Sequence, residues 1–379
     1  MARVAAYNEL PIHGGHVCSM TPFRDTHQGA LVLAPMTTGS NLPYRQLCQE
    51  LGARVTMSEM TVARRLKQKS RREFALIRRA PEERFFGVQL AGNHPEEMGW
   101  AAALVVARGA DWVDMNLGCP IDFFTRKGLG AALAREPNRV HRIVEAMRRA
   151  VPQPPISVKI RLGWNDAHRN YLDVARAAVE GGADAIVVHG RTRAARYTMS
   201  ADWDAIAEVA MAVPVPVVGN GDLLFRHEIE AALARTGCCG VMTARGALIK
   251  PWLFREVTEG DLDLTGEERV AIYRRYVALA KHHWGSDDRG VERIRPFVLW
   301  HLGFWCRYAP RHPDGRYPAM QVRTSWEPRT PLEALLARSD TGAHAFLADA
   351  LLAEIPIDPE RAPEPATAIA VDDDALEAG

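Results

Sequence analysis

Cys119 lies beside a proline at the end of an apolar run, in the stretch DMNLGCPIDFFTRKGLG (residues 114–130). A cysteine in such a place can be a metal ligand, a nucleophile, a proton donor or a small buried apolar residue. The chain holds 6 cysteines without a CxxC pair, which argues against a zinc site and against a disulfide framework. His13, His16 and Cys18 approach a ligand spacing but lack a second ligand pair, so we predict no metal site.

Polar residues recur at the ends of short apolar runs that have the composition of strands. In SVKIRLG, Lys159 and Arg161 are two positions apart and therefore share one face of a strand. Two cations that point into one space are costly without a partner, so this pair favours a bound ligand. A series of polar residues on successive strands indicates an elongated ligand site. The series comprises Glu59, Gln89, Asn116, Cys119, Lys159, Arg161, His189, Arg191, Asn220, Asp222 and Arg245.

The last two runs end in glycine-containing loops, VVGNGD and TARGAL. Glycines after the last two strands of a barrel let backbone N–H groups approach a phosphate, and Arg245 would add positive charge. Either loop alone would be an ordinary turn, but the two together favour phosphate binding. No GxGxxG motif opens a first strand–helix unit, which argues against a Rossmann-type nicotinamide site. The glycines concerned are Gly219, Gly221 and Gly246.

Flavin mononucleotide (FMN) suits this arrangement better than a tightly held nicotinamide cofactor. Its phosphate would reach the last two strands, while its ring would lie across the mouth of a barrel. Gln89 would then bond the pyrimidine edge of the ring, and Lys159 would lie near the N1 and O2 atoms.

The elements that must position these residues alternate between short apolar runs and helical stretches, from about residue 30 to residue 250. The runs are continuously apolar, as in parallel strands that are buried on both faces. Eight strand–helix units in this length are the pattern of a (β/α)₈ TIM barrel, whereas a doubly wound sheet would normally use fewer strands. The predicted strands cover residues 30–35, 54–59, 85–90, 112–117, 156–161, 185–190, 215–220 and 240–245.

After Pro251 the repeat ends, and apolar residues from about Leu264 recur at spacings of three and four, which predicts a small all-α helical domain. Residues 354–379 hold eight acidic residues and one arginine, which gives this segment a charge of −7. Because the whole chain carries +1, residues 1–353 carry +8. This acidic end is also rich in proline and alanine and is predicted to be disordered. The predicted divisions are an N-terminal extension (1–28), a cofactor-binding barrel (29–258), a helical domain (259–356) and a disordered tail (357–379).

Hydrophobic residues make up 47% and charged residues 25% of the chain, values that are ordinary for a globular protein. No stretch has the unbroken apolar length of a membrane span, and the N-terminus lacks the pattern of a signal peptide. We therefore expect a cytoplasmic protein that does not bind a membrane. The sequence points to no obligate protein partner and does not specify an oligomeric state.

Several motifs together resemble one family. They are LAPMTTGSNLPYRQLC, VQLAGNHPE, DMNLGCP with KGLGAAL, SVKIRLGW, VVHGRT, GNGD and ARGALIKPWLF, and they span roughly residues 30–255. In this order they resemble the tRNA-dihydrouridine synthases, flavoenzymes that reduce uridine in RNA. The later segment HHWGSDDRGVERIRPFVLWHLGFWCRYAP is most similar to the branch that modifies the tRNA variable loop in eukaryotes, although the zinc fingers of that branch are absent here.

The resemblance implies a role for each matching position. Cys119 would be the catalytic acid, and Asn116, Arg161 and Arg191 would lie near the target uracil. Two departures from the family pattern are Thr37–Thr38 after APM and Leu129 between the glycines of GLG, and neither touches the implied chemistry directly. The implied FMN contacts are Pro35, Met36, Thr37, Gln89, Lys159, His189, Asn220, Gly221, Asp222, Ala244 and Arg245.

The implied reaction agrees with these residue types. Saturating the C5=C6 bond of uracil requires a hydride at one carbon and a proton at the other. Flavin N5 would supply the hydride to C6, and a thiol on the opposite face would protonate C5. A free thiol has a pKa of about 8.5, so it is mostly protonated at neutral pH and can donate. NADPH would reduce the flavin during a transient visit, which is consistent with the absence of a Rossmann motif.

Two segments carry a basic bias that favours RNA binding. Residues 64–79 hold eight basic residues against one acidic residue, and residues 289–329 hold eight arginines against three acidic residues. Within the second segment, Trp300 and Trp305 are expected in the core of the helical domain. Basic segments at the mouth of a flavin barrel indicate contacts with a phosphate backbone, so the helical domain is predicted to bind tRNA.

Three alternatives remain open on the sequence alone. The same chemistry could act on ribosomal RNA, or an FMN barrel could act on a free pyrimidine. The chain could also be an RNA-binding protein without catalysis. The basic segments and the helical domain speak against a free pyrimidine, and the intact series of polar residues speaks against a non-catalytic protein.

Overall fold

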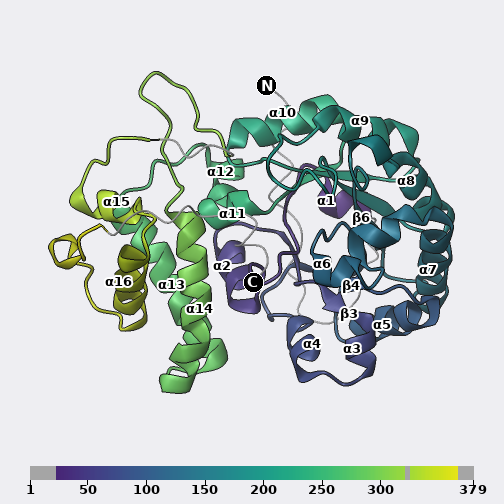
Figure 1. The fold of residues 1–379 in the computed structure, drawn as a ribbon, viewed down its shortest axis with the longest axis horizontal. Helices are drawn as coiled ribbons and strands as arrows, with labels where there is room; N and C mark the ends of the chain where they lie inside the picture. Colours follow the sequence, from purple (N-terminus) through teal and green to yellow (C-terminus); the bar gives the residue numbers. More distant parts are fainter. Residues whose placement is uncertain (1–22, 321–324, 366–379) are drawn as a thin grey trace.

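Eight parallel strands close into a barrel within the part of the chain that the computed structural model describes, residues 23–320 and 325–365 (Figure 1). The barrel closes because β1 pairs with both β2 and β9. The predicted TIM barrel is therefore confirmed, and each predicted strand overlaps an observed one. The strands are β1 (Leu31–Leu33), β2 (Val55–Met57), β4 (Phe85–Ala91), β5 (Trp112–Leu117), β6 (Ile156–Arg161), β7 (Ala185–His189), β8 (Val217–Asn220) and β9 (Gly240–Thr243).

One short strand escaped prediction. β3 (Thr61–Val62) pairs with the end of β4 and is too short to leave a pattern in the sequence. The registers of the long strands align predicted polar residues of neighbouring strands in pairs. Asn116 lies opposite Lys159, and His189 lies opposite both Arg161 and Asn220. The polar residues at the ends of β5 to β8 therefore lie side by side on neighbouring strands.

An outer layer of helices covers the barrel (Figure 1). α7 shows how the sequence produces this packing, because Val140, Ile143, Val144 and Met147 recur at helical spacing and are buried. No helix in the described residues is long and apolar enough to cross a membrane. The helices of the barrel are α2 (Leu42–Glu50), α3 (Ala63–Lys67), α4 (Arg71–Leu76), α5 (Pro95–Ala107), α6 (Asp122–Thr125), α7 (Pro137–Ala150), α8 (Tyr171–Glu180), α9 (Trp203–Ala212), α10 (Arg226–Thr236), α11 (Arg245–Ile249) and α12 (Leu253–Glu259).

A short helix, α1 (Phe23–His27), plugs the end of the barrel where the strands begin. The rings of Phe23 and His27 stack at 3.7 Å, and both lie against Trp112 at the start of β5. Burial lowers the pKa of His27 to about 4, against the opposing effect of its bond to the Phe23 carbonyl. The described part of the predicted N-terminal extension thus belongs to the barrel.

The predicted helical domain is also present and gathers on one side of the barrel (Figure 1). It shares one hydrophobic core with β1, α2 and α11 of the barrel. Tyr44 on α2 donates to the carbonyl of Ala247 at 2.7 Å and packs against Tyr276 and Phe297. The two parts therefore form one packed body. The helices of this domain are α13 (Gly266–Trp284), α14 (Asp288–Trp305), α15 (Pro331–Leu336) and α16 (Thr341–Leu352).

The boundary that the sequence predicted for the disordered tail, residue 357, is too close to the N-terminus. Residues 357–365 have a defined conformation that includes a 3₁₀ turn, η3 (Pro359–Arg361). Arg338 donates to the carbonyl of Pro363 at 2.7 Å, and Ile357 and Ala362 pack against the helical core. These apolar contacts outweigh the acidic and proline-rich composition of the segment. The rest of the predicted tail lies outside the described residues, as do His13, His16 and Cys18.

Candidate active site

A cavity opens where the strands of the barrel end, and it holds about 1050 Å³ of space including its open mouth. All fifteen residues predicted for the catalytic, cofactor and substrate sites line this cavity. They are Pro35, Met36, Thr37, Gln89, Asn116, Cys119, Lys159, Arg161, His189, Arg191, Asn220, Gly221, Asp222, Ala244 and Arg245. Of the polar strand-end series, Glu59 does not reach the cavity. Its carboxylate instead accepts a bond from the backbone N–H of Thr38 at 2.7 Å.

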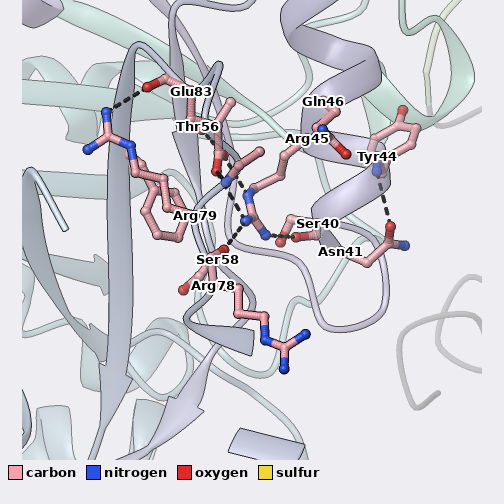
Figure 2. Close-up of polar contacts among 12 residues, drawn as sticks. Ser40, Asn41, Tyr44, Arg45, Gln46, Thr56, Ser58, Arg78, Arg79 and Glu83 are labelled. Atoms are coloured by element: carbon pink, nitrogen blue, oxygen red, sulfur yellow. Dashed lines mark hydrogen bonds and ion pairs between the residues drawn. The ribbon is translucent and has the colours of Figure 1, made fainter. Parts of the chain in front are cut away.

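The loop between β1 and α2, which carries Met36 and Thr37, is held by a buried ion pair (Figure 2). Arg45 Nε donates to Glu83 Oε1 at 2.7 Å, and Arg45 Nη1 donates to the carbonyl of Ser40 at 2.9 Å. The Ser40 hydroxyl in turn lies 2.9 Å from the Met36 nitrogen and 3.0 Å from the Met36 oxygen. Because a buried charge is costly unless paired, this network fixes the loop at the wall of the cavity.

A directed chain of hydrogen bonds holds the turn that carries Cys119. The N–H groups of Gly118 and Cys119 donate to Asn116 Oδ1 at 3.3 and 3.0 Å. Asn116 Nδ2 donates to Gln89 Oε1 at 2.7 Å, and Gln89 Nε2 donates to Asp114 Oδ2 at 2.8 Å. Backbone N–H groups can only donate, so the end of the chain at Cys119 fixes the orientations of both amides.

Asp114, which the sequence did not single out, is the acceptor end of this chain. It lies on β5 inside the barrel, two positions before Asn116, and Ser157 also donates to it. Burial raises the pKa of the Asp114 carboxyl to about 7, while the bonds from Ser157 and Gln89 and the charge of Lys159 act in the opposite direction. The signal in the sequence was an acidic residue on the inward face of a buried strand.

The loop after Cys119 folds back onto it through a glycine. Gly130 has φ +58°, and a Cβ atom there would lie 2.9 Å from Cys119 Cβ and 2.7 Å from its carbonyl oxygen. Any larger residue would therefore displace the turn. The next residue, Ala131, donates its N–H to the Cys119 carbonyl at 3.1 Å. The Cys119 side chain is 9% exposed and lines the cavity.

Cationic side chains on β6, the strand next to β5, form the adjoining wall of the cavity. Lys159 Nζ lies 3.2 Å from Asn220 Oδ1, and Arg161 Nε donates to the carbonyl of Gly118 at 2.8 Å. Lys159 and Arg161 point to the same side of β6, as their spacing predicted. Arg161 thereby ties the cationic wall to the turn of Cys119.

Arg191, predicted to contact substrate, is committed to an ion pair. Its guanidinium donates to both oxygens of Asp222 at 2.7 and 2.6 Å, and its Nε donates to the carbonyl of Met199 at 2.6 Å. Arg245 reaches the same carboxylate at 3.2 Å. Asp222 thus holds two arginines at one end of the cavity.

His189 is neutral in this surrounding. Burial lowers its pKa well below the ordinary value, and the charges of Arg161, Lys159 and Arg191 lower it further. Its Nε2 lies 3.3 Å from Arg191 Nη1, and since an arginine can only donate, Nε2 accepts and the proton is on Nδ1.

The helical domain supplies part of the wall, which the sequence analysis missed. Trp300 was expected in the core, but it is half-buried and lines the cavity together with Phe304 and Met320. Trp305 is buried in the core as predicted. Trp300 and Phe304 are four positions apart on α14 and share one face, which is also the pattern of an ordinary packed helix.

The sequence model of the family described as dihydrouridine synthase (Dus) matches residues 32–301. This range contains the strands of the barrel, except the first residue of β1, and most of α14. The chain belongs to the dihydrouridine synthase family. Within the described residues no group of three or more histidine, cysteine or acidic side chains could hold a metal ion.

Curated relatives of this family member are named tRNA-dihydrouridine(47) synthases, and their names specify NAD(P)(+). The protein of Coprinopsis cinerea is 38% identical over 346 residues, which cover 87% of this chain and 51% of that protein. The protein of Homo sapiens, named as synthase-like, is 39% identical over 341 residues, again with 87% and 51% coverage. The chain therefore spans about half the length of the curated relatives that it matches.

Among solved structures, this family member is similar to histamine dehydrogenase from Rhizobium sp. 4-9. The identity is 13% and the TM-score is 0.48, over 66% of this chain and 48% of that one. A likeness of this size carries no argument about the chemistry of the site.

Proposed function

We propose that this chain is an FMN-dependent enzyme that reduces the C5=C6 bond of a uridine in tRNA to dihydrouridine, with NADPH as the reductant. The observation that carries the proposal is that Cys119 and several cations line one cavity. Cys119 lies on a turn that is fixed by hydrogen bonds, and Lys159, Arg161 and Arg245 line the same cavity.

The charge of the cavity fits an anionic cofactor. Four cations line it against one carboxylate, that of Asp222, which leaves an excess of three positive charges. An excess of buried positive charge is unfavourable, and a phosphate group would offset it. The four cations are Lys159, Arg161, Arg191 and Arg245.

The loops after β8 and β9 also fit a phosphate. A Cβ atom on Gly246 would lie 1.9 Å from the carbonyl oxygen of Leu223, so the backbone passes there at a distance that only glycine allows. Gly221 has φ +143°, a conformation that side chains disfavour. Both glycines line the cavity together with Arg245, where a phosphate would meet the backbone.

The residues of the chain would divide the remaining tasks. Gln89 bonds Asn116 and Asp114 within the protein, yet an amide has two N–H groups and two acceptor lone pairs, so it retains capacity for the pyrimidine edge of the ring. Lys159 would lie beside the same edge, steadied by Asn220. When bound, FMN would supply the hydride to C6 of the uracil.

Cys119 would supply the proton to C5 from the wall of the cavity that it occupies. The chain from Asp114 to the N–H of Cys119 fixes the turn, so the thiol is presented without rearrangement. Arg161 and Asn116 would hold the uracil against the thiol. Proton uptake from solvent would then restore Cys119 for the next turnover.

We propose tRNA as the substrate and position 47 as the target, because the matched relatives carry both in their names. The exposed basic side chains of the segment after β2 support a polyanionic partner, and we expect the reaction to take place in the cytoplasm. These side chains are Arg64, Lys67, Lys69, Arg71 and Arg72.

The absorbance of the purified protein tests the cofactor assignment. We expect the visible bands of an oxidised flavin, bleached by NADPH in the absence of oxygen. Lys159→Ala should retain less flavin after dialysis, whereas Lys67→Ala, which changes an exposed lysine outside the cavity, should retain as much as the unmodified protein. A colourless protein that takes up no added FMN would contradict the proposal.

A further inference from the structure

Phe123 is an exposed aromatic side chain at the rim of the cavity. It lies on α6, two residues after Ile121, which lines the cavity as Cys119 and Pro120 do, and it is 49% exposed. Its neighbour Phe124 turns the other way and packs with Ile121 against Met60 and Cys119. The Phe124 ring is therefore packed beside Cys119, whereas the Phe123 ring is exposed.

Two cations approach the Phe123 ring from different segments. Lys127 Nζ lies 3.7 Å from the ring centroid, and Arg65 Cζ on α3 lies 5.8 Å from it. The negative face of an aromatic ring attracts cations, so these three side chains form one cluster. We call Phe123, Lys127 and Arg65 the rim cluster.

The guanidinium of Arg65 and the backbone of Lys127 are each held by further bonds. Arg65 Nη1 lies 3.3 Å from Glu73 Oε1, and the second oxygen of Glu73 accepts the N–H of Val62 at 2.8 Å. The carbonyl of Lys127 accepts a bond from Asn93 Nδ2 at 3.0 Å. The rim cluster thus joins the basic segment after β2 to the loop that carries Cys119.

We propose that the rim cluster is a stacking site for a nucleotide adjacent to the target uridine. The inference rests on the proposed function and adds a contact outside the cavity. A uridine that enters the cavity must leave its stack, and its neighbour then loses a stacking partner. An exposed ring can replace that partner, and cations beside it can meet the phosphates on either side.

The composition of the cluster selects RNA over an apolar protein segment. A partner that covered Phe123 with apolar atoms would also remove the charges of Lys127 and Arg65 from water, which is costly. A base that stacks on the ring face under Lys127 displaces the ammonium group from it, and the anionic oxygens of the nucleotide then replace the contact that Lys127 loses.

Binding of a tRNA transcript to the FMN-loaded full chain tests the proposal. We expect Phe123→Ala to raise the Kd for tRNA about ten-fold, because stacking of one base contributes about 1–3 kcal/mol. Phe123→Tyr should restore most of the affinity, since it restores a ring. Met211→Ala is the matched control, because Met211 is 81% exposed on α9 and does not line the cavity.

The salt dependence separates stacking from charge. Lys127→Ala should lower the slope of log Kd against log salt concentration by about one unit, as expected for one lost phosphate contact. Phe123→Ala should shift the line without changing its slope. Equal Kd values for Phe123→Ala and the unmodified chain, or equal losses for Phe123→Ala and Met211→Ala, would overturn the inference. If the unmodified chain binds no tRNA, the proposed RNA substrate fails instead.

Discussion

At the scale of single residues, the position of Cys119 depends on a carboxylate that does not line the cavity. Asp114 orients Gln89, Gln89 orients Asn116, and Asn116 accepts the N–H of Cys119. A buried amide that loses its partner costs about 1–3 kcal/mol, so each link depends on the one below it. The thiol is therefore positioned from inside the barrel.

Replacement of Asp114 tests this chain. Asp114→Asn should keep the direction of the hydrogen bonds in the chain, because the new carbonyl accepts from Gln89 and the new amide donates to Ser157. Asp114→Val leaves Gln89 without its acceptor and should slow dihydrouridine formation about ten-fold or more, since about 1.4 kcal/mol corresponds to ten-fold. Flavin content and circular dichroism of both variants are the controls. Equal rates for Asp114→Val and the unmodified chain would show that the chain does not position Cys119.

Replacement of the thiol tests the proton donor itself. Cys119→Ala should retain flavin and tRNA, yet lose most dihydrouridine formation because no acid remains at that wall. Flavin reduction by NADPH should continue at the unmodified rate, which separates this loss from loss of the cofactor. Cys306→Ala is the control, because Cys306 is buried in the helical domain and does not line the cavity. Unchanged turnover in Cys119→Ala would remove Cys119 from the mechanism.

At the scale of elements, the two ends of the barrel have different functions. The polar residues of the cavity lie where the strands end, whereas α1 closes the end where the strands begin, with Phe23 and His27. His27 is buried and its pKa is about 4 in the folded chain, against 6.5 for an ordinary histidine. The unfolded chain therefore binds a proton more readily between these values, and the folded state loses stability as the pH falls below 6.5.

The contribution of this plug can be measured by unfolding at two pH values. Between pH 7.5 and pH 5 the His27 linkage costs about 2 kcal/mol of unfolding free energy. In His27→Leu the loss of stability over the same interval should be smaller by about that amount. An exposed histidine, His282, provides the control variant His282→Leu. An unchanged pH dependence in His27→Leu would contradict the assignment.

At the scale of the whole molecule, the cavity belongs to two domains that share one core. Trp300, Phe304 and Met320 of the helical domain face the polar strand ends of the barrel. These apolar side chains and the cationic side chains line the same cavity. An apolar surface suits the flat ring of the proposed FMN, and the cations suit its phosphate. Cofactor binding should therefore depend on a domain that carries none of the cationic residues of the cavity.

Trp300→Ala tests this dependence. We expect its FMN dissociation constant to rise up to about ten-fold, since contacts of one aromatic ring contribute about 0.5–1.5 kcal/mol beyond burial. Trp284→Ala changes another half-buried tryptophan of the same domain that does not line the cavity, and it should bind FMN as the unmodified chain does. Equal affinities for Trp300→Ala and the unmodified chain would show that the wall does not touch the cofactor.

The sequence predicted the barrel because its strands are continuous apolar runs between helical stretches, and it predicted the lining of the cavity because polar residues follow those runs. It missed Asp114, since an inward carboxylate below the cavity looks like any polar residue inside a strand. It misplaced Trp300, since one face of α14 packs in the core and the next lines the cavity, and spacing alone does not separate them. Neither position follows from local pattern, because both depend on contacts between distant elements.

Mapping of dihydrouridine in tRNA tests the central claim most directly. Purified chain, FMN and NADPH are incubated with a tRNA transcript that carries uridine at position 47, and reduced positions are read by sequencing. We expect dihydrouridine at position 47 with the unmodified chain and almost none with Cys119→Ala. Reduction of ribosomal RNA or of free uridine in place of tRNA, or no reduction of any uridine by the flavin-loaded chain, would contradict this expectation.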